Sequence, residues 1–307
     1  MTNLSKIFSK DLLENNPNLF TFNLEKDPGF SSAYIGKTSE VAINEVPYIS
    51  QYEFVDGKLD PDISYKINSN GHRSDEFKKN PKDHILYSGC SNTTGMAAPF
   101  DINWATMLHK KINLNNDFFR LSYCSGSFQK IILNLFKYFN LFGNPNTLFL
   151  LLPNTSREMS FLNELDIDYE KRKFVDNLSY VDMGYLYPWE ENDIDSDKKY
   201  LTTSIENHKR MFILSYSCLF MLKQYCASNN IKLIYSTWDK YQSNLLLKIP
   251  EFNDMIDIYT DEYYKYIYDN RNRKDKYLMS ARDGDHIGVL DSEYISDIFY
   301  ERYKNAK

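Results

Sequence analysis

Two short segments, far apart in the chain, carry residue types that together can perform acyl transfer. The first, Gly89-Cys90-Ser91-Asn92-Thr93-Thr94-Gly95, directly follows the apolar run His84-Ile85-Leu86-Tyr87. The second, near the end of the sequence, is Asp283-Gly284-Asp285-His286. A serine hydroxyl becomes a useful nucleophile when a histidine accepts its proton and a carboxylate orients that histidine. We therefore expect Ser91 to be the nucleophile, His286 its base and Asp283 the orienting carboxylate.

Other roles are open to the same residues. Ser91 could merely cap the helix that we expect to follow it. Cys90 could be the nucleophile, although the alternation of side chains along an extended segment points it away from Ser91. Asp285 could replace Asp283, but its position directly beside His286 makes the geometry poor.

The elements that must position these residues alternate between strand-like and helix-like patterns from residue 84 onward. Apolar runs predict strands and apolar residues at helical spacing predict helices. In chain order they are a strand at 84–87, a helix at 104–112, a strand at 118–123, a helix at 128–140, a strand at 147–152, a helix at 204–228, a strand at 232–236 and a helix at 291–303. This order predicts an α/β fold with a mostly parallel sheet covered by helices on both faces.

Polar residues follow each predicted strand. Ser91 follows the first strand, Gly126 the second, Asn154 the third, and Trp238 and Asp239 the fourth. Chemistry in parallel sheets takes place beyond the carboxyl ends of the strands, so we expect these residues to share one edge. Gly126 could instead be a turn glycine and Asn154 a loop cap. Trp238 and Asp239 are candidates for substrate binding, with core packing the alternative for the tryptophan.

Two regions depart from this rhythm. Residues 1–80 are rich in turn-forming residues and predict an N-terminal arm or small β-rich subdomain, with extended pieces at 45–55 and 63–67, packed on a main domain at 81–307. Residues 155–200 are acidic and show no clear period. A long irregular segment in a compact domain is often functional, so a lid or substrate wall is expected there.

Composition narrows the class of protein. Hydrophobic residues make up 42% and charged residues 25%, as in globular proteins, and the net charge of -6 argues against a nucleic-acid partner. The longest apolar run, Leu148 to Leu152, is too short to span a membrane, and residues 1–16 lack a signal-peptide core. The four cysteines have no metal-binding or disulfide spacing, so we expect no metal and an intracellular setting.

Over roughly residues 80–307 the chain resembles the SGNH hydrolases, also called GDSL-type esterases and lipases. Four blocks in the family's order carry the resemblance: Gly89-Cys90-Ser91, Ser125-Gly126-Ser127, Leu152-Pro153-Asn154-Thr155 and Asp283-Gly284-Asp285-His286. Cys90 stands where the family has an aspartate that is not the triad carboxylate, and the third block keeps only its asparagine. Residues 68–77 also look like the lead-in of relatives from marine viruses and bacteria.

The resemblance implies a flavodoxin-like three-layer α/β/α fold and Ser-His-Asp catalysis without a cofactor. It also implies an oxyanion hole made of the backbone N–H groups of Ser91 and Gly126 and the side chain of Asn154. The expected function is a serine esterase that removes an acyl group, most simply acetyl, from a carbohydrate or small molecule. The protein would be cytoplasmic, or associated with a virion if it is viral.

Two other functions fit the same pattern. The chain could be a catalytically inactive structural or glycan-binding module that keeps the hydrolase fold, for example a virion component. It could also transfer the acyl group to a glycan. Arg73 lies near the predicted site edge and could bind an anion, but a structural ion pair is the favoured expectation, and His72 is expected to be a surface or locally bonded group. The sequence indicates no oligomeric state.

Overall fold

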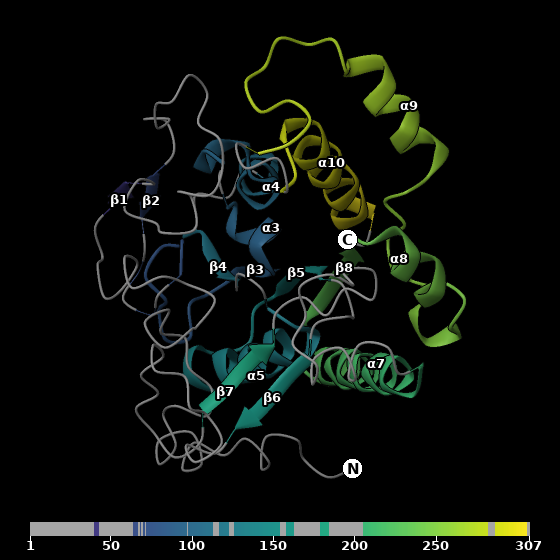
Figure 1. Ribbon diagram of the computed structural model, residues 1–307. Coiled ribbons are helices and arrows are strands. Elements are labelled where there is room, and N and C mark those ends of the chain that lie inside the picture. Colours follow the sequence, from purple (N-terminus) through teal and green to yellow (C-terminus); the bar gives the residue numbers. More distant parts are fainter. Residues whose placement is uncertain are drawn as a thin grey trace, which may run out of the picture.

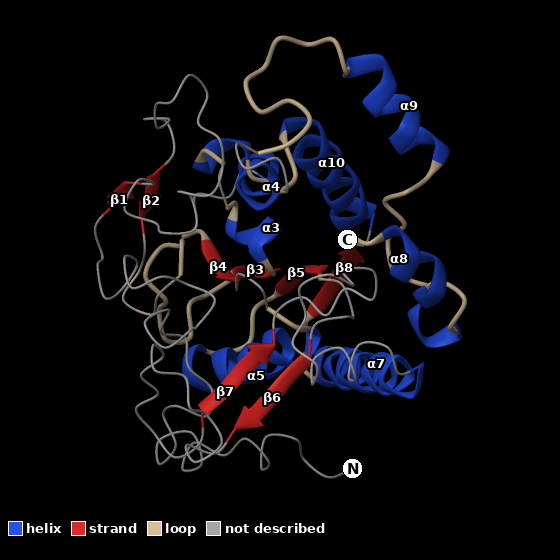
Figure 2. Ribbon diagram, in the orientation of Figure 1, coloured by secondary structure: helices blue, strands red, loops and turns tan. Residues whose placement is uncertain are grey.

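The computed structural model describes the central and C-terminal parts of the chain and several short pieces before them. The described residues are 40–42, 64–66, 68, 70, 72–96, 98–112, 117–122, 126–153, 158–162, 179–183, 205–281 and 286–305. They form three layers, with a sheet between two pairs of helices (Figures 1 and 2). The predicted α/β class is therefore confirmed.

The main sheet has four parallel strands in the order β4-β3-β5-β8. Their bounds are Ile85–Gly89 for β3, Phe119–Ser122 for β4, Thr147–Leu152 for β5 and Lys232–Thr237 for β8. The chain forms β3, then β4 on one side of it, then β5 and β8 on the other side. This is the flavodoxin-like winding, in which the direction of strand addition reverses between the first and third strands.

The strand register defines one functional edge. Gly89 at the end of β3 pairs with Ser122 of β4 and with Leu151 of β5, and Leu151 pairs with Ser236 of β8. The carboxyl ends of all four strands therefore lie in one row. Ligands of doubly wound sheets bind at this edge where the winding reverses, which here is between β3 and β5.

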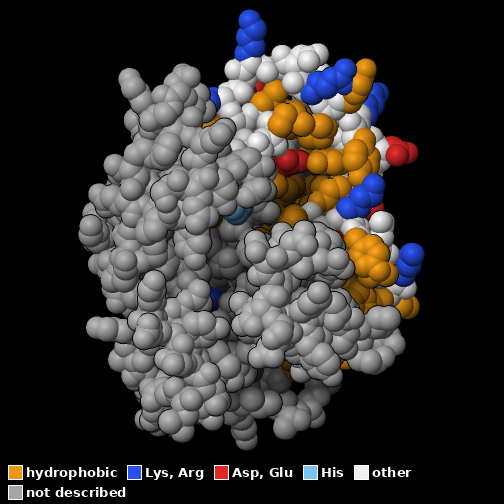
Figure 3. Space-filling view, viewed as in Figure 1, with side chains coloured by type: hydrophobic (Ala, Val, Ile, Leu, Met, Phe, Trp, Pro, Cys, Tyr) orange, Lys and Arg blue, Asp and Glu red, His pale blue; other side chains and the backbone are white. Residues whose placement is uncertain are grey.

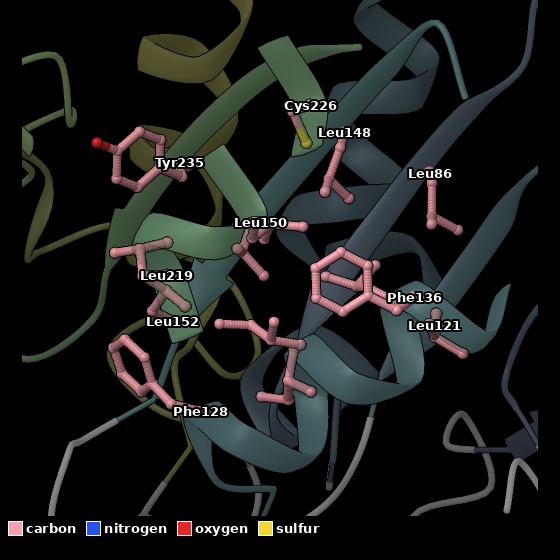
Figure 4. Close-up of a cluster of buried hydrophobic side chains, with 14 of the residues drawn as sticks. Leu86, Leu121, Phe128, Phe136, Leu148, Leu150, Leu152, Leu219, Cys226 and Tyr235 are labelled. Carbon is pink, nitrogen blue, oxygen red and sulfur yellow. The ribbon is translucent and has the colours of Figure 1, made fainter. Parts of the chain in front are cut away.

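Side chains of the central strands alternate between the two faces of the sheet. In β5, Leu148, Leu150 and Leu152 join a core cluster on one face, whereas Phe149 and Leu151 join a second cluster on the other. All six residues of β5 are buried. Burial on both faces explains why this strand is a continuous apolar run in the sequence. Figure 4 shows the first cluster, with Leu148, Leu150 and Leu152 beside Leu86 and Phe128.

Among the described residues, four helices cover the sheet. Helices α5 (Phe128–Phe142) and α7 (Ile205–Ser228) pack over the face of the first cluster, and α4 (Trp104–Ile112) and α10 (Val289–Asn305) over the face of the second (Figure 1). The sequence predicts all four helices and all four strands to within a few residues. Their apolar faces are clear because each helix contacts the sheet along one side only.

Between β8 and α10, the described residues form further elements that were not predicted as regular structure. Asp239 caps α8 (Lys240–Leu246), a short 3-10 turn η8 follows at Pro250–Phe252, and Thr260 caps α9 (Asp261–Asn270). Helix α9 has no fully buried residue, and its contact with the second core cluster is made by a half-buried tyrosine, Tyr263, rather than by aliphatic side chains.

Two small antiparallel sheets lie in residues 1–80 and 155–200, outside the alternating strands and helices. Strand β1 (Glu40–Ala42) pairs with β2 (Ser64–Lys66), and β6 (Glu158–Leu162) pairs with β7 (Ser179–Met183). Strand β2 falls within the predicted extended piece at 63–67. The β6–β7 pair lies inside the segment for which the sequence shows no period. The rest of residues 1–80 and 155–200, including the predicted extended piece at 45–55, lies largely outside the described residues.

Candidate active site

The turn that carries Ser91 begins where β3 ends against β5. A Cβ atom on Gly89 would lie 2.4 Å from the carbonyl oxygen of Leu151 and 2.2 Å from Oγ1 of Thr93, so this position has no room for a side chain. The backbone passes through Cys90 directly into α3 (Ser91–Thr94), a helix of four residues. Glycine therefore allows the chain to leave the sheet and turn within two residues.

Cys90 and Ser91 lie in different environments at this turn. Cys90 is fully buried in the first core cluster, whereas Ser91 is the first residue of α3 and is 4% exposed. The predicted opposition of the two side chains fits this placement, and Cys90 packs as a small apolar residue. As the first residue of the helix, Ser91 has an N–H group with no acceptor inside the helix.

Bonds to the neighbouring strand and loop hold α3 in place. The Thr94 hydroxyl donates to Oγ of Ser122, the last residue of β4, at 3.0 Å. The amide of Asn103, which follows η6 (Phe100–Ile102), donates to the carbonyl oxygen of Asn92 at 2.9 Å. Helix α3 then ends at Gly95, whose φ of 76° lies in the left-handed region that favours glycine.

His286 lies on a second, separately built piece of the site. Residues 286–290 pair with residues 277–281, since Ala281 N–H donates to the carbonyl oxygen of His286 at 2.8 Å and Val289 N–H donates to that of Tyr277 at 2.9 Å. Ser280 and Ile287 form an antiparallel bridge within this ribbon. His286 is half-buried there, just before α10 begins.

Asn92 joins the two pieces. Its side-chain oxygen accepts the backbone N–H of Ile287 at 3.3 Å, across 195 residues of sequence. Ser91 and His286 are the chain neighbours of these two bonded residues. The structure therefore brings the predicted nucleophile and the predicted base to the same place, although the described residues show no hydrogen bond between the Ser91 hydroxyl and the His286 imidazole.

The other predicted site residues divide into two groups. Asp283, Asp285 and Asn154 lie outside the described residues. Gly126 is buried and directly precedes Ser127, whose hydroxyl caps α5 by accepting the N–H of Lys130 at 3.2 Å. Gly126 thus follows β4, beside β3, at the predicted edge of the sheet.

Trp238 and Asp239 follow β8 at the same edge. The ring of Trp238 is half-buried and packs against both core clusters, and its carbonyl oxygen accepts a hydrogen bond from the hydroxyl of Tyr259. Asp239 accepts the N–H of Gln242 at 2.7 Å as the cap of α8. Both residues have structural partners, so the packing alternative for Trp238 has direct support.

Burial shifts the pKa of two groups near the site. His72 is buried, lies within hydrogen-bonding distance of the Ser122 carbonyl through Nδ1 at 3.1 Å, and has its pKa lowered to about 3 by burial. It is therefore neutral near pH 7, and the expectation of a surface position for this histidine is wrong. Burial raises the pKa of Asp291 in the first turn of α10, although a hydrogen bond from the Tyr263 hydroxyl opposes this.

The described residues lack the features of a metal centre and of a membrane span. They contain no group of three or more His, Cys, Asp or Glu side chains placed to hold a metal ion. None of their helices combines the length and apolar character needed to cross a membrane.

Comparisons with known proteins find solved structures whose similarity to this chain is low. No protein-family model matches the chain, and neither does any curated protein. It is similar to the crystal structure of a member of the lipolytic G-D-S-L protein family from Veillonella parvula, with 15% identity, 72% of this chain and 97% of that chain covered, and a TM-score of 0.29. It is also similar to a predicted acylhydrolase from Bacteroides fragilis, with 11% identity, 75% and 92% covered, and a TM-score of 0.35. At these values the likeness assigns no activity to this chain.

Proposed function

We propose that this protein is a serine esterase in which Ser91 is the nucleophile and His286 the general base. The hydrogen bond from Ile287 N–H to the side chain of Asn92 carries the proposal, because it joins the residue after Ser91 to the residue after His286. The location adds support, since α3 follows β3 beside β5, where doubly wound sheets bind ligands.

The proposed reaction uses each group in a defined role. The hydroxyl of Ser91 attacks the ester carbonyl while His286 takes its proton and then returns it to the leaving alcohol. Water, activated by the same imidazole, hydrolyses the acyl-enzyme. The N–H groups of Ser91 and Gly126 and the side chain of Asn154 would stabilise the oxyanion, and Asp283 would orient the base. Loss of one oxyanion donor commonly lowers the rate by about 10² to 10³.

We further propose that the substrate is an acyl ester, most simply acetyl, on a carbohydrate or a small molecule. Exposed tyrosines support a sugar-bearing substrate, because planar rings with a polar edge suit contact with sugars. Tyr241 of α8 and Tyr268 of α9 are 74% and 64% exposed, and Tyr264 is also exposed. Figure 3 shows hydrophobic side chains gathered on the part of this face where α8, α9 and α10 lie.

Hydrolysis of p-nitrophenyl acetate and labelling by a fluorophosphonate probe test the proposal. Wild-type protein should do both, and Ser91→Ala should lower kcat by at least about 10³-fold and abolish labelling. Ser88→Ala is a matched control, because Ser88 is a buried serine of β3 that is not part of the proposed machinery. Equal rates for wild type and Ser91→Ala would reject the esterase.

A second candidate is a glycan-binding module with no catalysis. The exposed tyrosines of α8 and α9, Tyr241 and Tyr268, favour it, because planar rings with a polar edge suit contact with sugars whether or not a reaction follows. A module of this kind would stay unlabelled by the fluorophosphonate but would be retained on an immobilised polysaccharide. Acyl transfer to a glycan would instead appear as labelling of Ser91 with little hydrolysis until sugar is added.

A further inference from the structure

Two buried arginines hold the turn that carries Ser91. Arg73 lies before β3 and Arg120 lies in β4, and their side chains are 1% and 0% exposed. Arg73 Nη1 donates to the carbonyl oxygens of Gly95 at 2.7 Å and Ala98 at 3.1 Å. Arg120 Nη1 donates to the carbonyl oxygen of Thr93 at 3.1 Å. These bonds go to backbone carbonyls at and just beyond the end of α3, so they fix where that helix lies.

The two arginines also support each other. Arg120 Nε donates to the carbonyl oxygen of Arg73 at 2.7 Å, and Arg120 Nη1 donates to Oδ1 of Asn103 at 3.0 Å. Asn103 in turn donates to the carbonyl oxygen of Asn92 at 2.9 Å. Successive carbonyls after Ser91, those of Asn92 and Thr93, are therefore both held by side chains from other parts of the chain.

A helix as short as α3 needs such support. It has four residues, and a single turn is unstable alone because forming the first turn restricts several residues for one hydrogen bond. The last carbonyls of any helix also lack partners inside the helix. The arginines supply these partners, and both guanidinium groups lie against the ring of Phe100, at 5.4 Å and 5.1 Å from its centre.

Burying two guanidinium groups is costly, and a turn at the surface could have its carbonyls satisfied by water at much lower cost. The arrangement therefore serves more than stability. We propose that Arg73 and Arg120 are positioning residues for Ser91, which fix the direction of its hydroxyl and its N–H group. This inference rests on the proposed esterase function.

The inference specifies which kinetic constant changes. Neither arginine is exposed enough to touch a substrate, so its loss should leave substrate binding largely unchanged. A displacement of the nucleophile by about 1 Å lowers the rate of the chemical step by about 10²-fold. Loss of either arginine should therefore lower kcat and the rate of fluorophosphonate labelling, with little change in KM for p-nitrophenyl acetate.

The experiment compares Arg120→Met, Arg120→Lys and a control in the core, Leu135→Ala. We expect Arg120→Met to lower kcat and the labelling rate by about 10²-fold. Lysine keeps the charge but cannot reach several acceptors, so Arg120→Lys should recover part of the rate and remain about tenfold slow. Leu135 is buried on α5 and makes no part of the turn, so its variant should lower Tm but keep kcat.

The outcomes separate this inference from the proposed function. A folded Arg120→Met variant with wild-type kcat and labelling would overturn the positioning role while leaving the esterase intact. If Arg120→Met does not fold, Arg120→Lys and Arg73→Lys decide in its place, and wild-type kcat in both would overturn the role. Wild-type protein that hydrolyses no ester and takes no label would overturn both proposals.

Discussion

Replacing Gly89 with alanine should separate the geometry of the nucleophile turn from the stability of the fold. The new Cβ atom would lie 2.4 Å from the carbonyl oxygen of Leu151, whereas ordinary contacts begin at 3.4 Å. Relief of this contact requires the end of β3 to move by about 1 Å relative to β5, and Ser91 follows only two residues later. We expect kcat and the rate of fluorophosphonate labelling to fall by about 10²-fold. Overpacking of this kind should also lower the free energy of unfolding by about 1–3 kcal/mol.

A second glycine provides the control. A Cβ atom on Gly143, at the C-terminal end of α5, would lie 2.6 Å from Oδ1 of Asn80, and its φ of 97° also disfavours alanine. Gly143 precedes β5 and so lies near the opposite edge of the sheet. Gly143→Ala should lower stability in urea unfolding without changing the labelling rate. Wild-type labelling by folded Gly89→Ala would refute the argument that this contact sets the position of Ser91.

Three further predictions concern the link between the halves of the site, a buried imidazole and two thiols. Asn92→Ala removes the acceptor of Ile287 N–H. The rate of fluorophosphonate labelling should fall by about tenfold, and thermal melts should show a loss of stability of about 1 kcal/mol. An unchanged labelling rate would argue against the link. The folded-state pKa of His72, about 3, is below its ordinary value of 6.5, so the stability that its neutral form supplies is complete above pH 6.5 and is lost as pH falls toward 3. Between pH 7.5 and 5, urea unfolding of wild type should lose about 2 kcal/mol more than His72→Gln, and equal losses would contradict the shift. Burial raises the pKa values of Cys218 and Cys226 to about 11 and about 12, so mass spectrometry should find both thiols unalkylated by iodoacetamide at pH 7.5 until denaturant is added.

The layers of the fold could be predicted because buried positions produce a regular pattern of apolar residues in the sequence. The run Leu148 to Leu152 is apolar throughout because both faces of β5 are covered, and α5 shows its apolar face at helical spacing. The edge that holds Ser91, Gly126 and Trp238 followed from strand order alone, since parallel strands share one carboxyl edge.

The hydrogen bonds that hold the site produce no periodic pattern in the sequence, so they could not be predicted. The bonds of Arg120 to the carbonyls of Arg73 and Thr93 join residues 47 and 27 positions apart and involve backbone atoms that every residue has. The bonds of Arg73 Nη1 to the carbonyls of Gly95 and Ala98 were not predicted for the same reason. The caps of α8 and α9 did leave a signal, because Asp239 and Thr260 are good N-cap residues, and acidic residues follow Thr260.

The two halves of the site are held by different means, and this bears on how they could meet. The half that carries Ser91 is fixed by side chains that bond backbone carbonyls. The half that carries His286 is fixed by a backbone ribbon and by Gly288, where a Cβ atom would lie 2.5 Å from the carbonyl oxygen of Tyr277. Among the described residues, the bond between Asn92 and Ile287 connects them at 3.3 Å. Under the proposed mechanism, the ribbon holds the imidazole of the base and the buried arginines fix the position of the Ser91 hydroxyl.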